Sequence, residues 1–449
     1  MKPPKPTPRP DKVTLWQYLK LFRKDLLSAQ PQRLYRAWMA EFRTPFFRSY
    51  LVNQPHLVDT VLKQRPDDFP KSNRISEGLR PLLGNSVFLT NGETWKRQRR
   101  IIDPAFEGGR LKDTFPAMLG AAQACVERLR DQTGTVVECE ETTSHAAADV
   151  IFRTLFSVPI EDEVAAQVFD KFQDYQRQQP LLNLAAFMPI PRWVPRVHSR
   201  TTRRNAKDIK ALITRLTSER AELIAKRQAP DDLATKIMTT PDPETGRCFD
   251  TREMVDQVAI FFLAGHETSA SALAWTLYLV ALYPEWQEKL SAEAQALDAS
   301  DFAAVSKLRL SRDVFREALR LYPPVPMMVR ETTSPEHFRG RDVPTGSQIV
   351  LSPWHLHRQE RLWDRPDEFD PTRWSTENGK SCQRTAYIPF SAGPRVCTGA
   401  GFAMIEGPLL LSTLLRHFRF EVVEGRTPVP VAHLTVRSKD GIWLRVVER

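Results

Sequence analysis

Apolar residues recur at helical spacing through most of the chain. This pattern predicts helices over 16–42, 110–130, 144–156, 162–178, 203–228, 311–321 and 400–417, with others beginning near Pro55 and Trp95. The longest predicted helix runs from about Thr251 to Tyr283, between the capping residue Asp250 and Pro284. Its apolar stretch raises the question of a membrane span. His266 and Glu267 in its middle favour a buried central helix instead, because charges are costly at bilayer depth.

Short strands are predicted over 49–52, 348–351 and 436–446. Pro and Gly interrupt the segments 69–91 and 189–195, which we expect to be loops. Helices therefore dominate the middle, and short β pieces cluster toward both ends. No linker or internal repeat divides the chain, so we expect one domain over residues 1–449, mainly α with a small β-rich lobe. Residues 1–14 should form a Pro-rich, extended arm.

The charge balance is basic, with 64 Lys and Arg against 54 Asp and Glu and a formal charge of +10. The basic residues are scattered through apolar helices and do not form blocks with interleaved aromatics. This scatter argues against binding to nucleic acid and favours an acidic protein partner or plain solubility.

The expected location is the cytoplasm. Five Cys residues suggest no disulfide framework, which fits a reducing compartment. The N-terminal residues MKPPKPTPRPDK have no apolar stretch behind them, so we expect neither a signal peptide nor stable membrane insertion. The basic amphipathic helix over 16–42 can lie on a membrane, but a packed surface helix is the favoured interpretation.

The segment Phe390-Ser-Ala-Gly-Pro-Arg-Val-Cys397-Thr-Gly399 carries the sharpest chemical signal. A Cys at the start of a helix lies where backbone N–H groups and the helix dipole stabilise a thiolate. Phe390 can shield the sulfur from water, and Arg395 offers a fork for a carboxylate. A shielded thiolate is a good axial ligand for haem iron. The alternative is a buried structural Cys before a surface helix, the usual state of a lone Cys.

This segment resembles the haem-binding loop F-x-x-G-x-R-x-C-x-G of the cytochrome P450 superfamily, with every specified position matched. The resemblance runs from about Asn85 to the C-terminus and leaves the N-terminal arm outside. It implies the cytochrome P450 fold, with haem b between the long central helix and the Cys loop. Cys397 would then be the axial ligand of the iron.

The long helix contains Ala264-Gly-His-Glu-Thr268, which resembles the family's A-G-x-[D/E]-T motif. The resemblance implies that Glu267 relays protons and that Thr268 holds dioxygen-derived species by a hydrogen bond. Ala264 and Gly265 would leave room for oxygen and haem. The alternative is a buried polar pair satisfied by nearby backbone. His266 is expected to be a packed helix residue, not a ligand.

Two further motifs follow the family's order. Glu317-Ala-Leu-Arg320 resembles E-x-x-R, which the family pairs with a downstream Arg, here Arg373, in a structural network. Trp95-Lys-Arg-Gln-Arg99 resembles W-x-x-x-R, whose indole and guanidinium bind a haem propionate. By family position, Arg330 and Arg395 would make other propionate contacts, although Arg330 can equally be a solvated surface residue.

The implied reaction is insertion of one atom of dioxygen into a hydrophobic organic substrate, with electrons from NAD(P)H through a separate ferredoxin or flavodoxin and its reductase. The chain ends 52 residues after Cys397, which leaves no room for a fused reductase. An acidic carrier is expected to dock on basic residues near the Cys side of the haem, Lys96, Arg97, Arg100, Arg110 and Lys112.

Two rival functions remain at this stage: a peroxygenase or isomerase, which needs no proton relay for dioxygen, and a non-enzymatic haem sensor or carrier. By family position, the substrate walls would be residues 82–88, 181–188, 263–264, 325–329 and 432–434. These residues are mainly aliphatic and include Met327 and Met328. Such walls favour a neutral or weakly polar substrate and leave its identity open.

Overall fold

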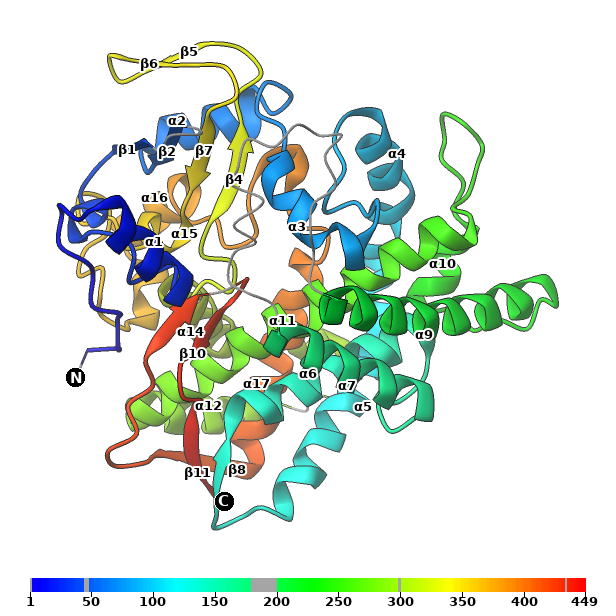
Figure 1. The fold of residues 1–449 in the computed structure, drawn as a ribbon. Coiled ribbons are helices and arrows are strands. Elements are labelled where there is room, and N and C mark those ends of the chain that lie inside the picture. Colours follow the sequence, from blue (N-terminus) through cyan, green and yellow to red (C-terminus); the bar gives the residue numbers. More distant parts are fainter. Residues whose placement is uncertain (1, 44–47, 179–199, 298–299, 433) are drawn as a thin grey trace.

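The computed structural model describes residues 2–43, 48–178, 200–297, 300–432 and 434–449 (Figure 1). The helices among them are α1 (Leu15–Lys24), α2 (Pro55–Asp59), α3 (Asn73–Leu83), α4 (Gly92–Ile102), α5 (Gly108–Arg130), α6 (Cys139–Phe156), α7 (Glu163–Gln178), α9 (Arg200–Ala225), α10 (Leu233–Thr239), α11 (Thr251–Leu282), α12 (Pro284–Ala296), α13 (Phe302–Val305), α14 (Arg309–Leu321), α15 (Pro353–Leu356), α16 (Glu377–Thr385) and α17 (Ala400–His417). The expected dominance of helices in the middle of the chain is confirmed.

The strands form small, separate sheets. They are β1 (Met39–Arg43), β2 (Arg48–Val52), β3 (Val136–Glu138), β4 (Met328–Glu331), β5 (Glu336–Phe338), β6 (Arg341–Val343), β7 (Gln348–Leu351), β8 (Phe418–Val422), β9 (Pro430–Ala432), β10 (Val436–Ser438) and β11 (Trp443–Glu448). The largest sheet has the order β1-β2-β7-β4, with β2 and β7 parallel. A second sheet, β3-β11-β8, joins the segment before α6 to the C-terminus.

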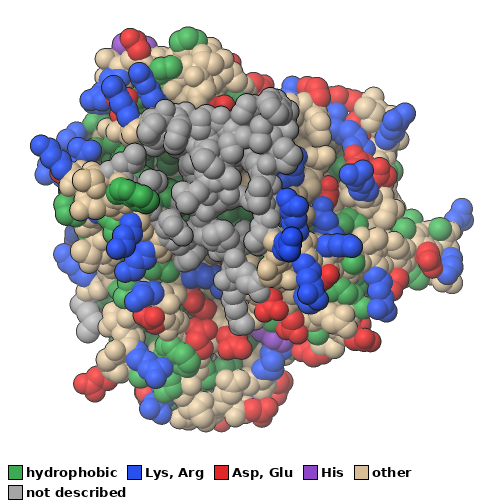
Figure 2. Space-filling model, in the orientation of Figure 1, with side chains coloured by type: hydrophobic (Ala, Val, Ile, Leu, Met, Phe, Trp, Pro, Cys, Tyr) green, Lys and Arg blue, Asp and Glu red, His purple; other side chains and the backbone are tan. Residues whose placement is uncertain are grey.

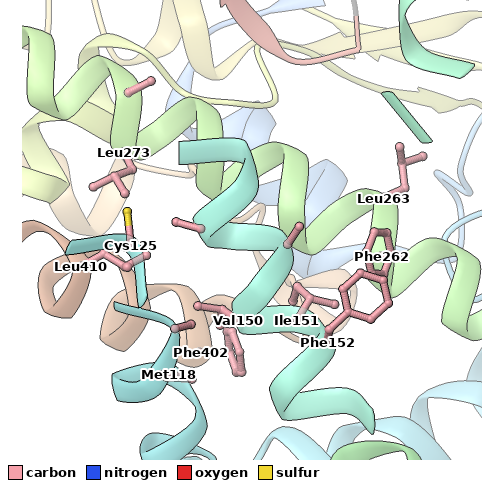
Figure 3. Close-up of a cluster of buried hydrophobic side chains, with 14 of the residues drawn as sticks. Met118, Cys125, Val150, Ile151, Phe152, Phe262, Leu263, Leu273, Phe402 and Leu410 are labelled. Atoms are coloured by element: carbon pink, nitrogen blue, oxygen red, sulfur yellow. The ribbon is translucent and has the colours of Figure 1, made fainter. Parts of the chain in front are cut away.

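Helix α11 crosses the centre of the helical part of the molecule (Figure 1). Asp250 caps it through a capping box with Glu253, as its place in the sequence predicts. It packs against α6, α9, α14 and α17. Figure 3 shows side chains of α11 such as Phe262, Leu263 and Leu273 in one apolar cluster with side chains of α5, α6 and α17. None of the described helices is both long and apolar enough to cross a bilayer.

Two predictions near the N-terminus are wrong. The helix expected over 16–42 ends at Lys24, where Asp25 turns the chain by accepting hydrogen bonds from the N–H groups of Leu27 and Ser28. Its second half contains strand β1, which pairs with β2. The loop expected over 69–91 contains helix α3, capped by Ser72. Pro81 lies inside this helix and removes one donor there, and the helix ends two residues later at Leu83.

Other predictions agree closely with the structure. Strand β7 and helix α17 have the predicted bounds, and the strand region 436–446 divides into β10 and β11 at Gly441, whose φ is +80°. The Pro-rich segment 189–195 lies outside the described residues.

The predicted network of Glu317, Arg320 and Arg373 is confirmed and is fully buried. Glu317 accepts from Arg320 at 2.8 Å and from Arg373 at 3.2 Å. Arg320 also donates to the carbonyls of His357, Pro366 and Glu368. Buried charges are tolerated only when every donor and acceptor is satisfied. The network therefore fixes the irregular segment that precedes the Cys loop.

Candidate active site

The backbone of the Cys loop adopts a conformation that requires glycine at one position. Gly393 has a φ of +69°, and a Cβ atom there would collide with the carbonyl of Leu62. The N–H of Cys397 donates to the carbonyl of Phe390 at 2.9 Å, which closes the loop immediately before α17. The Phe390 ring packs beside Phe315 and Leu319 of α14. The loop thus holds Cys397 at the N-terminal end of α17.

The Cys397 residue is accessible, yet the surrounding protein atoms raise the pKa of its thiol by displacing water. The N–H of Gly399 and the charge of Arg99 lower the pKa and so favour the thiolate.

Helix α11 contributes a stripe of accessible residues to the interior. Between its first turn and Leu282, the residues that are not buried are Phe261, Ala264, Gly265, Thr268 and Ser269, with Ala264 the most exposed. Their spacing of three or four places them on one face of the helix. The rest of the helix between its first turn and Leu282 is buried, so this stripe is the part of that stretch that a ligand can reach.

The acid and alcohol of the motif have well-defined partners. The hydroxyl of Thr268 donates to the carbonyl of Ala264 at 2.5 Å. Glu267 is buried and accepts from the hydroxyl of Thr435 at 2.7 Å, and the Arg437 guanidinium lies 3.5 Å from the same oxygen. No sequence motif signals Thr435 or Arg437, which arrive from the β9–β10 segment.

The other two residues of the motif pack against neighbouring side chains. Gly265 lies at the edge of the accessible stripe, and a Cβ atom there would collide with Ile151, so this glycine allows close packing of α11 on α6. His266 packs against Phe169 and Phe262, as expected. Burial lowers the pKa of its imidazole to about 3, which keeps the ring neutral.

Four cationic side chains meet around Trp95. Lys71, Arg99 and Arg395 lie 5.8, 5.9 and 4.9 Å from the centre of its ring. Arg330 belongs to the same group because its charge lowers the pKa of Lys71. The sequence predicts Trp95 and the three arginines but misses Lys71, which follows Pro70 outside any motif. It is brought opposite Arg330 by an isolated antiparallel bridge.

Two of the four cations have carboxylate partners: Arg99 pairs with Asp103 at 2.8 Å, and Arg395 lies 3.6 Å from Asp67. No carboxylate among the described residues forms an ion pair with Lys71 or Arg330, and Nε of Arg395 is buried without a partner. Burial and the charge of Arg395 lower the pKa of Arg330 to about 10, and burial lowers that of Lys71 well below its ordinary value. A ligand with two carboxylates would relieve this repulsion. The donor set therefore fits the two propionates of haem.

The expected substrate walls border the same interior only in part. Val325, Met327 and Val329 are half-buried, and Leu263 and Leu82 are buried. The segment 181–188 and residue 433 lie outside the described residues.

The basic residues expected to dock a redox partner are mostly paired. Their ion pairs are Lys96 with Glu93, Arg97 with Glu253, Arg100 with Asp242 and Glu244, and Arg110 with Asp113 and Asp231. Lys112 has no ion pair among the described residues. Because six carboxylates lie against four of these cations, the set carries less positive charge than the sequence suggests, and its role in docking stays a prediction.

The family model, the related sequences and the solved structures that match this chain all point to one protein family. The model of the family Cytochrome P450 matches residues 6–444, so the match begins much earlier than the expected Asn85. Cyclooctat-9-en-7-ol 5-monooxygenase of Streptomyces melanosporofaciens is 32% identical, over 87% of this chain and 84% of that protein. A cytokinin hydroxylase of Arabidopsis thaliana is 28% identical, over 91% and 82%. The crystal structure of a mutant cytochrome P450DA heme domain superimposes with a TM-score of 0.81 at 25% identity, covering 100% of this chain and 98% of that one.

The buried Lys71 predicts a pH dependence of stability in the protein without its prosthetic group. Its pKa is lower in the folded state than in the unfolded chain, so the unfolded state binds more protons between the two values. The wild type should therefore gain stability relative to Lys71→Met as the pH rises from about 8 to 10.5. Urea unfolding of both proteins across this range measures the difference.

The matched control is Lys96→Met, because hydrogen bonding to Glu93 raises the pKa of Lys96 on the exposed surface. Wild type should show no gain relative to this variant. A Lys71→Met difference that stays constant with pH would contradict the predicted burial of a charged amine.

Proposed function

The chain belongs to the cytochrome P450 family and is a haem-dependent monooxygenase, and on this premise we propose that it oxidises a hydrophobic organic substrate with electrons delivered from NAD(P)H by separate carrier proteins. The observation that supports the site assignment most strongly is the contact between the cations around Trp95 and the Cys397 loop, where Arg99 donates to the carbonyl of Val396. The accessible stripe of α11 is the third feature. These features come from segments far apart in the sequence, and their charges fit the two propionates of haem b.

The proposed roles in binding follow from these positions. The Cys397 thiolate would bind the haem iron, and the propionates would be held by Trp95, Arg99, Arg330, Arg395 and Lys71. Ala264 lies on the accessible stripe of α11, where its small side chain would leave room for the bound group. Phe390 packs behind the Cys loop and keeps water from the sulfur. Haem with a thiolate ligand activates dioxygen for insertion of one oxygen atom.

Proton handling is assigned to Thr268 and Glu267. The hydroxyl proton of Thr268 is directed to the carbonyl of Ala264, so its oxygen is left to accept a hydrogen bond from a ligand in the interior space. Thr435 and Arg437 hold the Glu267 carboxylate on one side. The carboxylate can exchange a proton while these partners keep it near the stripe.

The substrate is proposed to be a neutral or weakly polar hydrophobic molecule. The described walls are aliphatic, and Met327 can adapt to irregular shapes. The related cyclooctat-9-en-7-ol 5-monooxygenase acts, by its name, on a molecule with a single named hydroxyl group, which agrees with this class.

The electron carrier is proposed to be a ferredoxin or flavodoxin with its reductase, in the cytoplasm. The family match occupies residues 6–444, so these residues belong to the haem domain and to no reductase. The sparse cysteines, free in the structure, agree with a reducing compartment.

The axial assignment is tested by exchange of the ligand. Cys397→His should abolish the far-shifted Soret band that a thiolate gives to the ferrous carbonyl complex, because imidazole donates less electron density. Cys125→Ser, Cys139→Ser, Cys248→Ser and Cys382→Ser should each keep the band. If one of these four loses the band and Cys397→His retains it, the thiolate is a different cysteine.

If Thr268 and Glu267 handle protons, changing either residue should reduce the amount of product formed per reductant consumed. Thr268→Ala should keep consuming reductant and dioxygen but form less product and more hydrogen peroxide, whereas Thr268→Ser should recover most of the coupling. Glu267→Gln keeps the side-chain volume but cannot carry a proton on a carboxylate, so the proton-transfer step should slow by about 10²–10⁴-fold. Turnover driven by added peroxide should survive both changes better.

The measurement is the ratio of product to reductant consumed. Glu253→Gln is the matched control, since Glu253 lies on the same helix but pairs with Arg97 at its beginning. Unchanged coupling in Thr268→Ala and Glu267→Gln would remove the proton assignment and favour a peroxygenase or a haem sensor.

The ion pairs on the expected docking face predict a weak dependence of reduction on salt. Four of its five basic residues are neutralised locally. The rate of reduction by a ferredoxin should therefore fall less than about threefold between about 0.1 and 0.5 M salt, where screening removes long-range steering. A fall of tenfold or more would mean that the carrier docks on a basic surface elsewhere.

A further inference from the structure

Helix α1 presents a basic face with one large aromatic side chain to solvent. Trp16, Lys20 and Lys24 are four residues apart and so align along one side of the helix; we call them the outer face of α1. Trp16 is 82% exposed, the highest fraction among the large hydrophobic side chains of the described residues. Both lysines are exposed as well.

The opposite side of α1 packs on the protein. The ring of Tyr18 stacks on Phe42 of β1 with 6.3 Å between the ring centres, and it contacts Phe22 one turn further along α1. Burial raises the pKa of the Tyr18 hydroxyl. The helix is therefore seated through its apolar side, and the exposure of Trp16 is not a consequence of a detached helix.

Both ends of α1 are tied to the body of the molecule. On the N-terminal side, Lys5 forms an ion pair with Asp367 at 2.8 Å, and the hydroxyl of Tyr322 donates to the carbonyl of Pro4 at 2.7 Å. At the C-terminal end, Asp25 accepts from the N–H of Ala432 at 2.8 Å. These ties give the outer face one orientation relative to the rest of the protein.

The positive charge of the chain is concentrated here. Residues 1–36 contain nine Lys or Arg and two Asp, a net +7 of the +10 of the whole chain, and no acidic residue lies between 12 and 24. Lys2, Lys12, Lys20 and Lys24 form no ion pair with any described residue. Figure 2 shows Lys and Arg side chains, with few Asp or Glu, on the margin where Figure 1 places α1.

We propose that the outer face of α1 binds the surface of an anionic lipid bilayer. A single exposed apolar residue would need no explanation. An exposed Trp beside several lysines without an ion pair among the described residues combines a ring that favours the membrane interface with charges that attract anionic lipid. Trp places its ring among the headgroups, and the lysines extend their ammonium groups to lipid phosphates. An acidic protein is the weaker fit, because protein interfaces are depleted in Lys and favour Arg.

The experiment is sedimentation of the haem-loaded protein with lipid vesicles. Vesicles of phosphatidylcholine with about 30 mol% phosphatidylglycerol should bind it, and vesicles of phosphatidylcholine alone should bind it far less. Each lysine removed should weaken binding about fivefold, so the double change Lys20→Gln and Lys24→Gln should weaken it about 25-fold. Trp16→Ala should weaken it about tenfold, since the ring no longer leaves water.

The matched control is the double change Lys226→Gln and Lys307→Gln, which removes the same charge from exposed positions on other elements. It should lower binding less than about twofold. The carbonyl spectrum of each variant checks that the fold and the haem are intact.

The proposal is overturned if the control weakens binding as much as the α1 change, or if the anionic vesicles bind no better than neutral ones. It is also overturned if the α1 variants bind vesicles normally but are reduced more slowly by an acidic ferredoxin, which would make the outer face a protein-binding surface.

Discussion

The burial of α11 is the constraint on which the rest of the structure depends. A helix of 32 residues that is covered by α6, α9, α14 and α17 must be apolar or satisfied on nearly every side. Its accessible positions form one stripe that includes Ala264 and Thr268. Between its first turn and Leu282, α11 is accessible to a ligand only along this stripe, so the site has to be built opposite it.

The Cys loop and the cations complete the site by different means. The loop is held by backbone geometry, since Gly393 alone permits its approach to Leu62, and by the buried network around Glu317 that fixes the preceding segment. The cations around Trp95 are held against their mutual repulsion by the surrounding fold. Arg330 is buried and Lys71 largely so, both without a carboxylate partner among the described residues, which destabilises the protein alone, and a dianionic ligand would supply the missing charges.

The charge of a surface region depends on the ion pairs that its residues form with other segments. Arg100 and Arg110 are basic in the sequence, but carboxylates from other segments neutralise them. The lysines of α1 form no ion pair with any residue that the structure describes. The formal net charge of +10 therefore comes mainly from one end of the chain.

The sequence alone determined the features that depend on a few consecutive residues. The cap at Asp250, the bounds of α17 and the Cys397 loop could be predicted because spacing, capping and glycine geometry act locally. Tertiary structure alone decided where segments far apart in the chain meet. The division of residues 16–42 into a helix and a strand depends on pairing with β2, and Lys71 joins the site through its place opposite Arg330. Gly265 serves packing on Ile151 because α6 lies there. Each of these depends on long-range neighbours, which no local pattern encodes.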